Sequence, residues 1–227
     1  MILNKIYNEN CLETMSRMED NSIDLVLTDP PYGIGEAKKN HKSRGKLAVA
    51  KDYGSHNWDN EIPSAEIFKE IFRISKNQII FGGNYFVEHL KNSSCWIVWD
   101  KDNGSSDFAD CELAWTSFKS ATRLKKHRWA GMLQEDMSNK EYRFHPTQKP
   151  LPLFKWILNS YAKPGQLVYD PFLGSGTTAV ACKDLGMNYI GSELSLEYCD
   201  IAESRLAQGV LDLFTESVVE PVELGEE

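Results

Sequence analysis

The chain has 227 residues, of which 41% are hydrophobic, and a formal net charge of −8; its size fits one α/β domain with a single core. No apolar run is long enough to span a bilayer, and polar residues within the first ten positions interrupt any signal-peptide pattern, so we expect a cytoplasmic protein without membrane contact. Five cysteines, odd in number and never at metal-ligand spacing, predict reduced thiols and no metal site.

The first predicted elements are a short strand over residues 4–7 and a helix that ends near Met18. Asn10 lies immediately before this helix, where its side chain can cap a free backbone N–H group. The next element, residues 23–28, is a short apolar run of the kind found in buried parallel strands.

This second strand ends abruptly in Asp29-Pro30-Pro31-Tyr32. Because the residue before each proline is held extended, we expect a stiff loop at the carboxyl end of the strand, where open α/β sheets bind ligands. Asp29 and the Pro30 carbonyl can accept hydrogen bonds from an exocyclic amino group, and Tyr32 offers a ring on which a planar base stacks. The quartet therefore suits methylation of an amino group, although a strand-to-turn junction with a half-buried tyrosine explains the same residues.

The middle of the chain begins with a polar stretch, residues 33–62, that is too long for a simple connection. We expect this stretch to become ordered over the substrate. The elements predicted after it are a helix that begins at Pro63-Ser64, strands over 78–81, 95–99 and 112–118, a short helix over 84–90, and a helix after Pro152 that reaches Tyr161.

The net charge is distributed unevenly along the chain. Residues 193–227 hold ten acids and one base, so the remainder carries a charge of about +1. Within it, residues 33–57 hold six bases and two acids, and residues 117–129 hold five bases and no acid. Such loops contact phosphate even in acidic proteins, although solvated loops have the same composition. Their place beside the quartet favours DNA-facing loops over 36–58 and 117–144, with candidate contacts at Lys38, Lys42, Arg44, Lys125, Lys126, Arg128 and Trp129.

A second motif follows a strand predicted over residues 167–170. Gly174 and Gly176 lie in the loop 171–178, which precedes a helix closed by Gly186, so the backbone can approach a ligand at a helix start. The third glycine of the dinucleotide fingerprint is absent, which gives no specific indication of a pyrophosphate. Glu193 follows the next strand at roughly the twenty-residue offset at which an acid reaches ribose hydroxyls. The order of these elements predicts a nucleoside site.

The last predicted helix begins after Ser195 and ends near Gln208. The following residues, 211–227, are acidic and lack the apolar content of a second core, so we interpret them as a partly disordered tail. The sequence thus predicts one catalytic domain over residues 1–210.

Together these motifs resemble the β group of the S-adenosylmethionine-dependent amino-group DNA methyltransferases. The resemblance covers nearly the whole chain to the end of the last helix, and three further stretches carry it: 82–86, 99–101 and 145–150. It implies an open, mainly parallel Rossmann-like sheet with helices on both faces and a circularly reordered motif order, with the catalytic motif first.

The resemblance also implies roles for individual residues. The catalytic residues would be Asp29, Pro30, Pro31 and Tyr32. The cofactor would be held by Asn10, Cys11, Asp29, Lys149, Asp170, Phe172, Gly174, Ser175, Gly176, Thr177 and Glu193.

An aspartate at the first catalytic position is typical of the adenine-N6 members, so we expect methylation of a flipped-out adenine in DNA, as in restriction-modification systems. Cytosine N4 in DNA and adenine in RNA stay open as acceptors. A non-catalytic DNA-binding module with a decayed cofactor site and a nucleotide-dependent oxidoreductase are the alternatives outside the family. The interval 129–144 is short, which favours a relaxed or very short target sequence, and a homodimer stays open.

Overall fold

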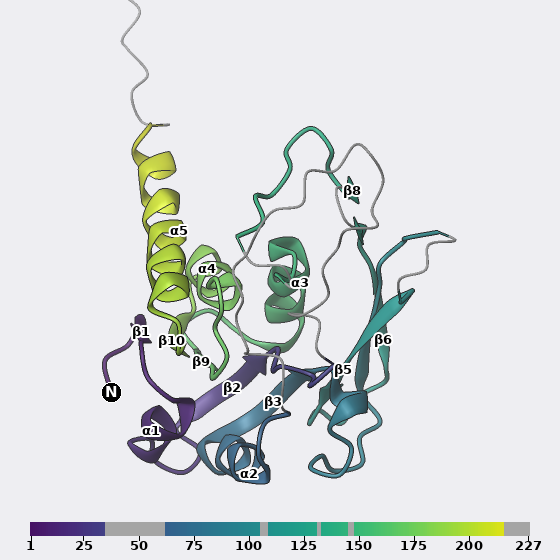
Figure 1. Cartoon of the computed structure of the whole chain (residues 1–227), viewed down its shortest axis with the longest axis vertical. Helices are drawn as coiled ribbons and strands as arrows, with labels where there is room; N and C mark the ends of the chain where they lie inside the picture. Colours follow the sequence, from purple (N-terminus) through teal and green to yellow (C-terminus); the bar gives the residue numbers. More distant parts are fainter. Residues whose placement is uncertain (35–61, 105–108, 131–132, 145–147, 216–227) are drawn as a thin grey trace, which may run out of the picture.

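The computed structural model describes residues 1–34, 62–104, 109–130, 133–144 and 148–215. Its centre is an eight-stranded sheet in the order β1-β10-β9-β2-β3-β5-β4-β6, which Figure 1 shows from β1 at one side to β6 at the other. The strands are β1 (Lys5–Tyr7), β2 (Ile23–Thr28), β3 (Ser75–Phe81), β4 (Trp96–Asp100), β5 (Cys111–Thr116), β6 (Arg123–Lys126), β9 (Leu167–Asp170) and β10 (Asn188–Ser192). A separate pair consists of β7 (Trp129–Ala130) and β8 (Leu133–Gln134).

Five consecutive strands, from β1 to β3, pair in parallel, whereas β5 is antiparallel to both of its neighbours. This confirms the predicted open, mainly parallel Rossmann-like sheet. Strands β2 and β9 are adjacent, with Leu25 opposite Val168 and Val26 opposite Tyr169. Because parallel strands end at the same edge of a sheet, the loops after β2 and β9 meet there. The circularly reordered motif order stays an interpretation of the sequence.

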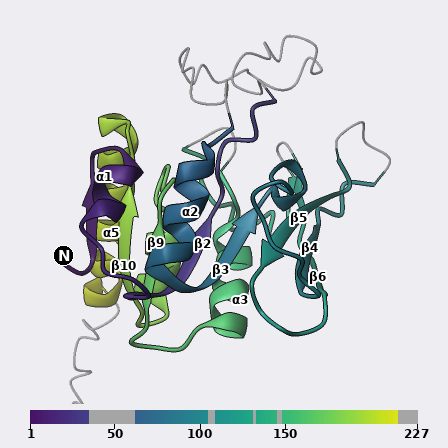
Figure 2. The ribbon, with the colours of Figure 1, turned by 90° about the horizontal axis from the view of Figure 1, so that it is seen from below.

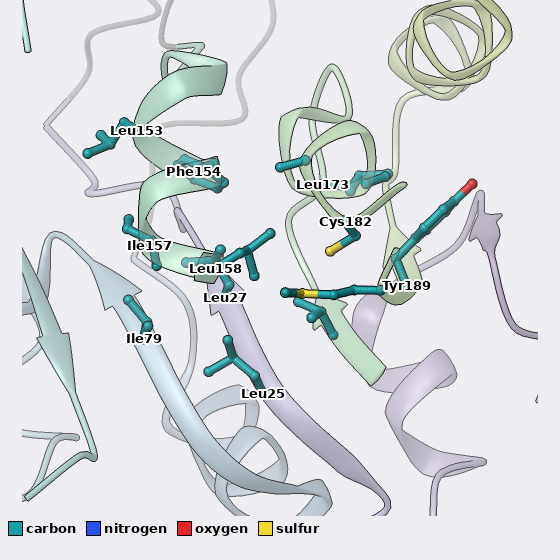
Figure 3. Packing of buried hydrophobic residues seen from close by; sticks show 14 of the residues in the cluster. Leu25, Leu27, Ile79, Leu153, Phe154, Ile157, Leu158, Leu173, Cys182 and Tyr189 are labelled. Carbon is teal, nitrogen blue, oxygen red and sulfur yellow. The ribbon is translucent and has the colours of Figure 1, made fainter. Parts of the chain in front are cut away.

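The helices cover both faces of the sheet. Helices α1 (Cys11–Ser16) and α2 (Ala65–Ile74) lie on one face, and α3 (Leu151–Tyr161), α4 (Thr177–Asp184) and α5 (Leu196–Thr215) lie on the other (Figures 1 and 2). Alternate strand residues divide between these layers. Leu25 and Leu27 of β2 pack with α3, as Figure 3 shows, whereas Val26 packs with the α1 and α2 side.

Several boundaries differ from the sequence predictions. Where a helix was expected over 84–90, the structure has only a 3-10 turn, Gly83–Tyr85. Phe86 is the only buried residue of the stretch 84–90, whereas Tyr85 and Val87 are exposed, so the stretch lacks an apolar helix face. The basic segment expected to be a loop contains the edge strand β6. Helix α5 continues to Thr215, past its predicted end near Gln208, because no proline interrupts residues 209–215. The acidic tail stays a prediction. Residues 216–227 and the whole of the predicted loop 36–58 lie outside the described residues.

No helix within the described ranges is long and apolar enough to cross a membrane.

Candidate active site

A cavity of about 630 Å³ lies at the carboxyl ends of the central strands. Its walls come from the segments that follow β1, β2, β9 and β10, together with residues 148–149, so the sheet topology creates it. Of the eleven residues predicted for the cofactor, all except Gly176 line this cavity: Asn10, Cys11, Asp29, Lys149, Asp170, Phe172, Gly174, Ser175, Thr177 and Glu193. Lining residues outside that prediction include Glu9, Gln148, Thr178, Leu194 and Tyr198.

Gly174 and Glu193 together fix the conformation of the loop after β9. Gly174 has φ +54°, and a Cβ built on it would meet nothing within 4 Å. Its N–H donates to Glu193 Oε2 at 2.8 Å, and Ser195 N–H donates to Glu193 Oε1 at 2.9 Å. Burial raises the pKa of Glu193, although these backbone donors lower it. The carboxylate is therefore fixed at the cavity wall, with lone pairs left for ligand hydroxyls.

Gly176 packs against α5 and does not line the cavity, and its predicted cofactor contact stays a prediction. It has φ +85°, and a Cβ on it would lie 2.6 Å from Ala202 Cβ. The residue must be glycine because α5 crosses the loop at this point.

Asn10 and Cys11 occupy the loop between β1 and α1. Asn10 caps the helix, since its side chain accepts from Leu12 N–H at 2.9 Å, and it also lines the cavity. Cys11 is buried, which raises the pKa of its thiol to about 11. A thiol with this pKa is not a nucleophile at neutral pH.

Asp170 joins the two central strands. Its Oδ1 accepts from Thr28 Oγ1 at 2.7 Å and from Phe172 N–H at 3.0 Å, and its Oδ2 accepts from Thr178 Oγ1 at 2.5 Å. Burial raises the pKa of Asp170 to about 6, against the effect of these donors. Three donors on one buried carboxylate indicate that Asp170 holds the loops in place.

The quartet after β2 forms a hydrogen-bonded cluster with Lys149. Asp29 Oδ2 accepts from Lys149 Nζ at 2.5 Å, and Asp29 Oδ1 accepts from Tyr32 Oη at 2.6 Å. Burial raises the pKa of Asp29 against the opposing charge of Lys149. Burial lowers the pKa of Lys149, but the carboxylates of Asp29 and Glu112 outweigh it and raise that pKa. Burial also raises the pKa of Tyr32, so its hydroxyl is a donor. Lys149 is buried, so the pair is shielded from solvent.

Two neighbours hold the Tyr32 ring, namely the ring of Tyr85 and the backbone of Gly82. It stacks on Tyr85 with ring centroids 5.0 Å apart and planes 15° apart. Gly82 packs against the ring: a Cβ on Gly82, which has φ +66°, would lie 2.2 Å from Tyr32 Cε1. The sequence 82–86 thus fixes the orientation of the ring that the quartet presents.

Two groups near the site were missed by the sequence reasoning. Glu112 of β5 lies between Lys149 and Lys101, at 3.1 Å and 2.5 Å. Arg205 of α5 donates to the Ser175 carbonyl at 2.6 Å and forms an ion pair with Glu141 at 3.2 Å. The available signals were a glutamate within an otherwise apolar strand and the single base among residues 193–227.

The residues predicted to contact DNA have different surroundings in the structure. Lys126 and Arg128 form ion pairs with Asp102 at 2.8 Å and 2.6 Å, and both side chains are about half exposed. The Lys125 ammonium lies 5.9 Å from the centre of the Trp156 ring. Trp129 corrects the prediction, since it is buried and its indole donates to the Gln148 carbonyl at 3.1 Å. Lys38, Lys42 and Arg44 lie outside the described residues.

Comparison with known proteins places this site in a family. The family model described as DNA methylase, for N6 and N4 amino-group methylation, matches residues 88–204, about half of the chain. The chain belongs to the N6/N4 DNA methylase family. The methylase is 30% identical over 253 residues to the type II methyltransferase M.HinfI of Haemophilus influenzae, which covers 91% of this chain and 69% of that protein.

Solved structures share the architecture of the methylase. The M1.HpyAVI–SAM complex is 26% identical, with a TM-score of 0.55, over 89% of this chain and 98% of its own. The cytosine-N4-specific PvuII DNA methyltransferase is 16% identical, with a TM-score of 0.59, over 93% of this chain and 91% of its own. At that identity the second likeness concerns the fold alone.

Proposed function

We propose that this DNA methylase transfers a methyl group from S-adenosylmethionine to N6 of a flipped-out adenine in DNA. The observation that carries the proposal is the place of Asp29: its carboxylate lies at the wall of the cavity, at the end of a proline-stiffened strand and beside the aromatic ring of Tyr32. The target base must leave the helix stack to reach such a recessed group.

The cavity suits S-adenosylmethionine in size and chemistry. Its volume of about 630 Å³ lies within the range of small-molecule sites, and Gly174 leaves open space where a side chain would project. Glu193, fixed by two backbone N–H groups, would accept hydrogen bonds from ribose hydroxyls. Leu194 and Tyr198 would supply apolar surface for the adenine ring, and the loop 173–175 would cover the methionine arm.

Asp29, Pro30 and Tyr32 would handle the target base. Asp29 and the Pro30 carbonyl would accept hydrogen bonds from the amino group, which localises the nitrogen lone pair, while Tyr32 stacks on the base. When bound, S-adenosylmethionine supplies an electrophilic methyl group whose bond to sulfur breaks as the bond to nitrogen forms, with the electron pair left on sulfur. The nitrogen must then lose one proton, and a buried carboxylate with a raised pKa is a suitable acceptor.

Cytosine N4 is the second candidate acceptor, because the fold is shared with a cytosine-N4-specific enzyme. The aspartate at position 29 favours adenine, since it is typical of the adenine-N6 members that the chain resembles. Both acceptors are exocyclic amino groups, so the same donor and acceptor geometry serves either base.

The experiment that tests the proposal identifies the modified base. Purified protein is incubated with S-adenosylmethionine and DNA from a methylation-deficient host, and the digested nucleosides are analysed by mass spectrometry. We expect N6-methyladenine to accumulate with time. N4-methylcytosine in its place would overturn the assignment of the base, and the absence of any methylated nucleoside from DNA, with RNA modified instead, would overturn the substrate.

A further inference from the structure

Glu112 belongs to a buried row of alternating charges that ends at Asp29. The row runs Lys101, Glu112, Lys149, Asp29, with nitrogen-to-oxygen distances of 2.5, 3.1 and 2.5 Å along it. Its members come from the residue after β4, from β5, from the segment before α3 and from the loop after β2. The side chains are between 6% and 21% exposed, so water screens the row only weakly.

The Lys149 ammonium has two carboxylates within reach, and it bonds to them unequally. It donates a hydrogen bond to Asp29 Oδ2 at 2.5 Å, whereas the buried Glu112 Oε2 lies farther away, at 3.1 Å, in a longer ion pair. A small rotation of the lysine side chain would exchange one carboxylate for the other. The Phe81 and Tyr32 rings, 5.4 and 5.6 Å from the ammonium, confine it between the two acids.

An amino group that binds Asp29 must compete with the two hydrogen bonds that Asp29 already accepts. Both of its oxygens already accept a hydrogen bond, one from Tyr32 and one from Lys149. An incoming amino group brings its own N–H donors, and the charge-assisted bond to Lys149 is the stronger competitor. Without another acceptor nearby, displaced Lys149 would be a buried charge with no counterion, which is costly.

We propose that Glu112 is a positioning residue for methyl transfer, which shares the Lys149 ammonium with Asp29 and takes it over when the target amino group binds to Asp29. This inference rests on the proposed function, because it needs Asp29 to be the acceptor of the amino protons. Lys101 neutralises the outer oxygen of Glu112 and so limits how strongly Glu112 attracts Lys149.

The charges around Asp29 predict the direction in which each variant shifts the pKa of Asp29. Lys149 and the Tyr32 hydroxyl donate hydrogen bonds to Asp29 and stabilise its ionised form, whereas the nearby carboxylates of Glu112 and Asp170 disfavour that form, and Lys101 acts through Glu112. Removal of the Glu112 charge therefore lowers the pKa of Asp29 and leaves Lys149 bound to it. Removal of the Lys101 charge leaves Glu112 less neutralised, which raises the pKa of Asp29.

The test compares Glu112→Gln and Lys101→Met with the parent enzyme, using DNA from a methylation-deficient host and radiolabelled S-adenosylmethionine. We expect Glu112→Gln to lower kcat by about 10-fold and to move the acid limb of kcat/KM to lower pH by about 1 unit. Lys101→Met should move the same limb to higher pH. Asp184→Asn is the matched control, because Asp184 forms a surface ion pair with Lys155 at 2.6 Å; its pH profile should equal that of the parent.

Affinity for S-adenosylmethionine and the melting temperature of each variant separate a positioning role from a structural one. A loss of kcat in Glu112→Gln without any shift of the acid limb would overturn the inference, as would shifts of the two variants in the same direction. If one variant does not fold, the direction of the shift in the other decides by itself. An Asp29→Ala enzyme that still methylates DNA would instead overturn the proposed function on which the inference rests.

Discussion

Single side chains at the cavity wall carry the binding energy that we assign to the cofactor. Glu193 is held by the N–H groups of Gly174 and Ser195, so its carboxylate has no freedom to lose when a ligand binds. This contrasts with an exposed acid, whose side-chain ordering would offset much of the hydrogen-bond gain. The buried position of Asp170, close by, serves a different purpose, because its acceptor sites are already filled by protein donors.

Glu193→Ala should weaken the binding of S-adenosylmethionine by roughly 2–4 kcal/mol, since two hydrogen bonds to a charged acceptor are lost. Isothermal titration calorimetry measures this change directly. Glu203→Ala, on the exposed side of α5, is the control and should bind as the parent does. Equal affinity of the Glu193 variant and the parent would refute the ribose assignment.

Asp170 should make the folded protein less stable as the pH rises through its titration. Its pKa is about 6 in the folded protein, above the ordinary value of 3.8, so folding favours the protonated form. The free energy of unfolding therefore falls between about pH 4 and pH 6 because of this group, by about 2–3 kcal/mol. Asp170→Asn should lack this part of the pH dependence. Urea unfolding of both proteins between pH 4.5 and pH 7.5 tests it; parallel stability curves would contradict the assignment.

At the scale of elements, the last helix ties the cofactor loop to the segment before α3. Arg205 of α5 reaches the Ser175 carbonyl and Glu141, and Glu141 Oε2 accepts from Leu151 N–H at 2.9 Å at the start of α3. Gln148 joins the same group, since it donates to Glu141 Oε1 at 2.8 Å. One buried ion pair thus connects α5, the loop 174–177 and the residues leading into α3.

Arg205→Met alone should destabilise the protein by about 3 kcal/mol, because Glu141 would be left buried without its counterion. The double variant Arg205→Met with Glu141→Gln should recover part of this loss. Chemical denaturation of the two single variants and the double variant gives the coupling energy. Additive losses in the double variant would show that the two side chains do not act as a pair.

The sequence predicted those elements whose signals are local. Apolar runs bounded by proline or glycine located β2, β9 and β10, and Asn10, Ser64 and Gly186 located helix ends. The partner of Glu112 could not be predicted in this way, because Lys149 is 37 positions away and only the antiparallel insertion of β5 brings them together. The packing of Gly176 was missed for the same reason, because its close neighbour, Ala202, lies in α5.

At the scale of the whole molecule, a protein with a net charge of −8 must bind DNA, which is also negatively charged. The described bases near the sheet edge β6 provide one path, since Lys126 and Arg128 share the single carboxylate of Asp102 and remain about half exposed. Asp102 therefore neutralises only one of the two positive charges. Exposed ion pairs of this kind are weak, so phosphate can compete for both side chains.

Neutralisation of Lys125, Lys126 and Arg128 together should weaken DNA binding for every sequence alike. Each lost phosphate contact should reduce the slope of log affinity against log salt by about 0.9 on duplex DNA. Lys76→Gln is the control, because Lys76 lies at the start of β3, at the opposite end of the strand from the site. Salt titrations that give the triple variant the slope of the parent would place the DNA path elsewhere.

The central claim is that the carboxylate of Asp29 acts on the target amino group and not on the cofactor. Asp29→Ala removes a charge-assisted acceptor whose contribution to the transition state is ~2–4 kcal/mol, so the rate of DNA methylation should fall by roughly 30- to 1000-fold. The decisive measurement compares this rate with the affinity for S-adenosylmethionine, measured on the same protein by calorimetry. Our account predicts a large loss of rate with affinity nearly unchanged; near-normal turnover, or a loss of affinity that accounts for the whole loss of rate, would contradict it.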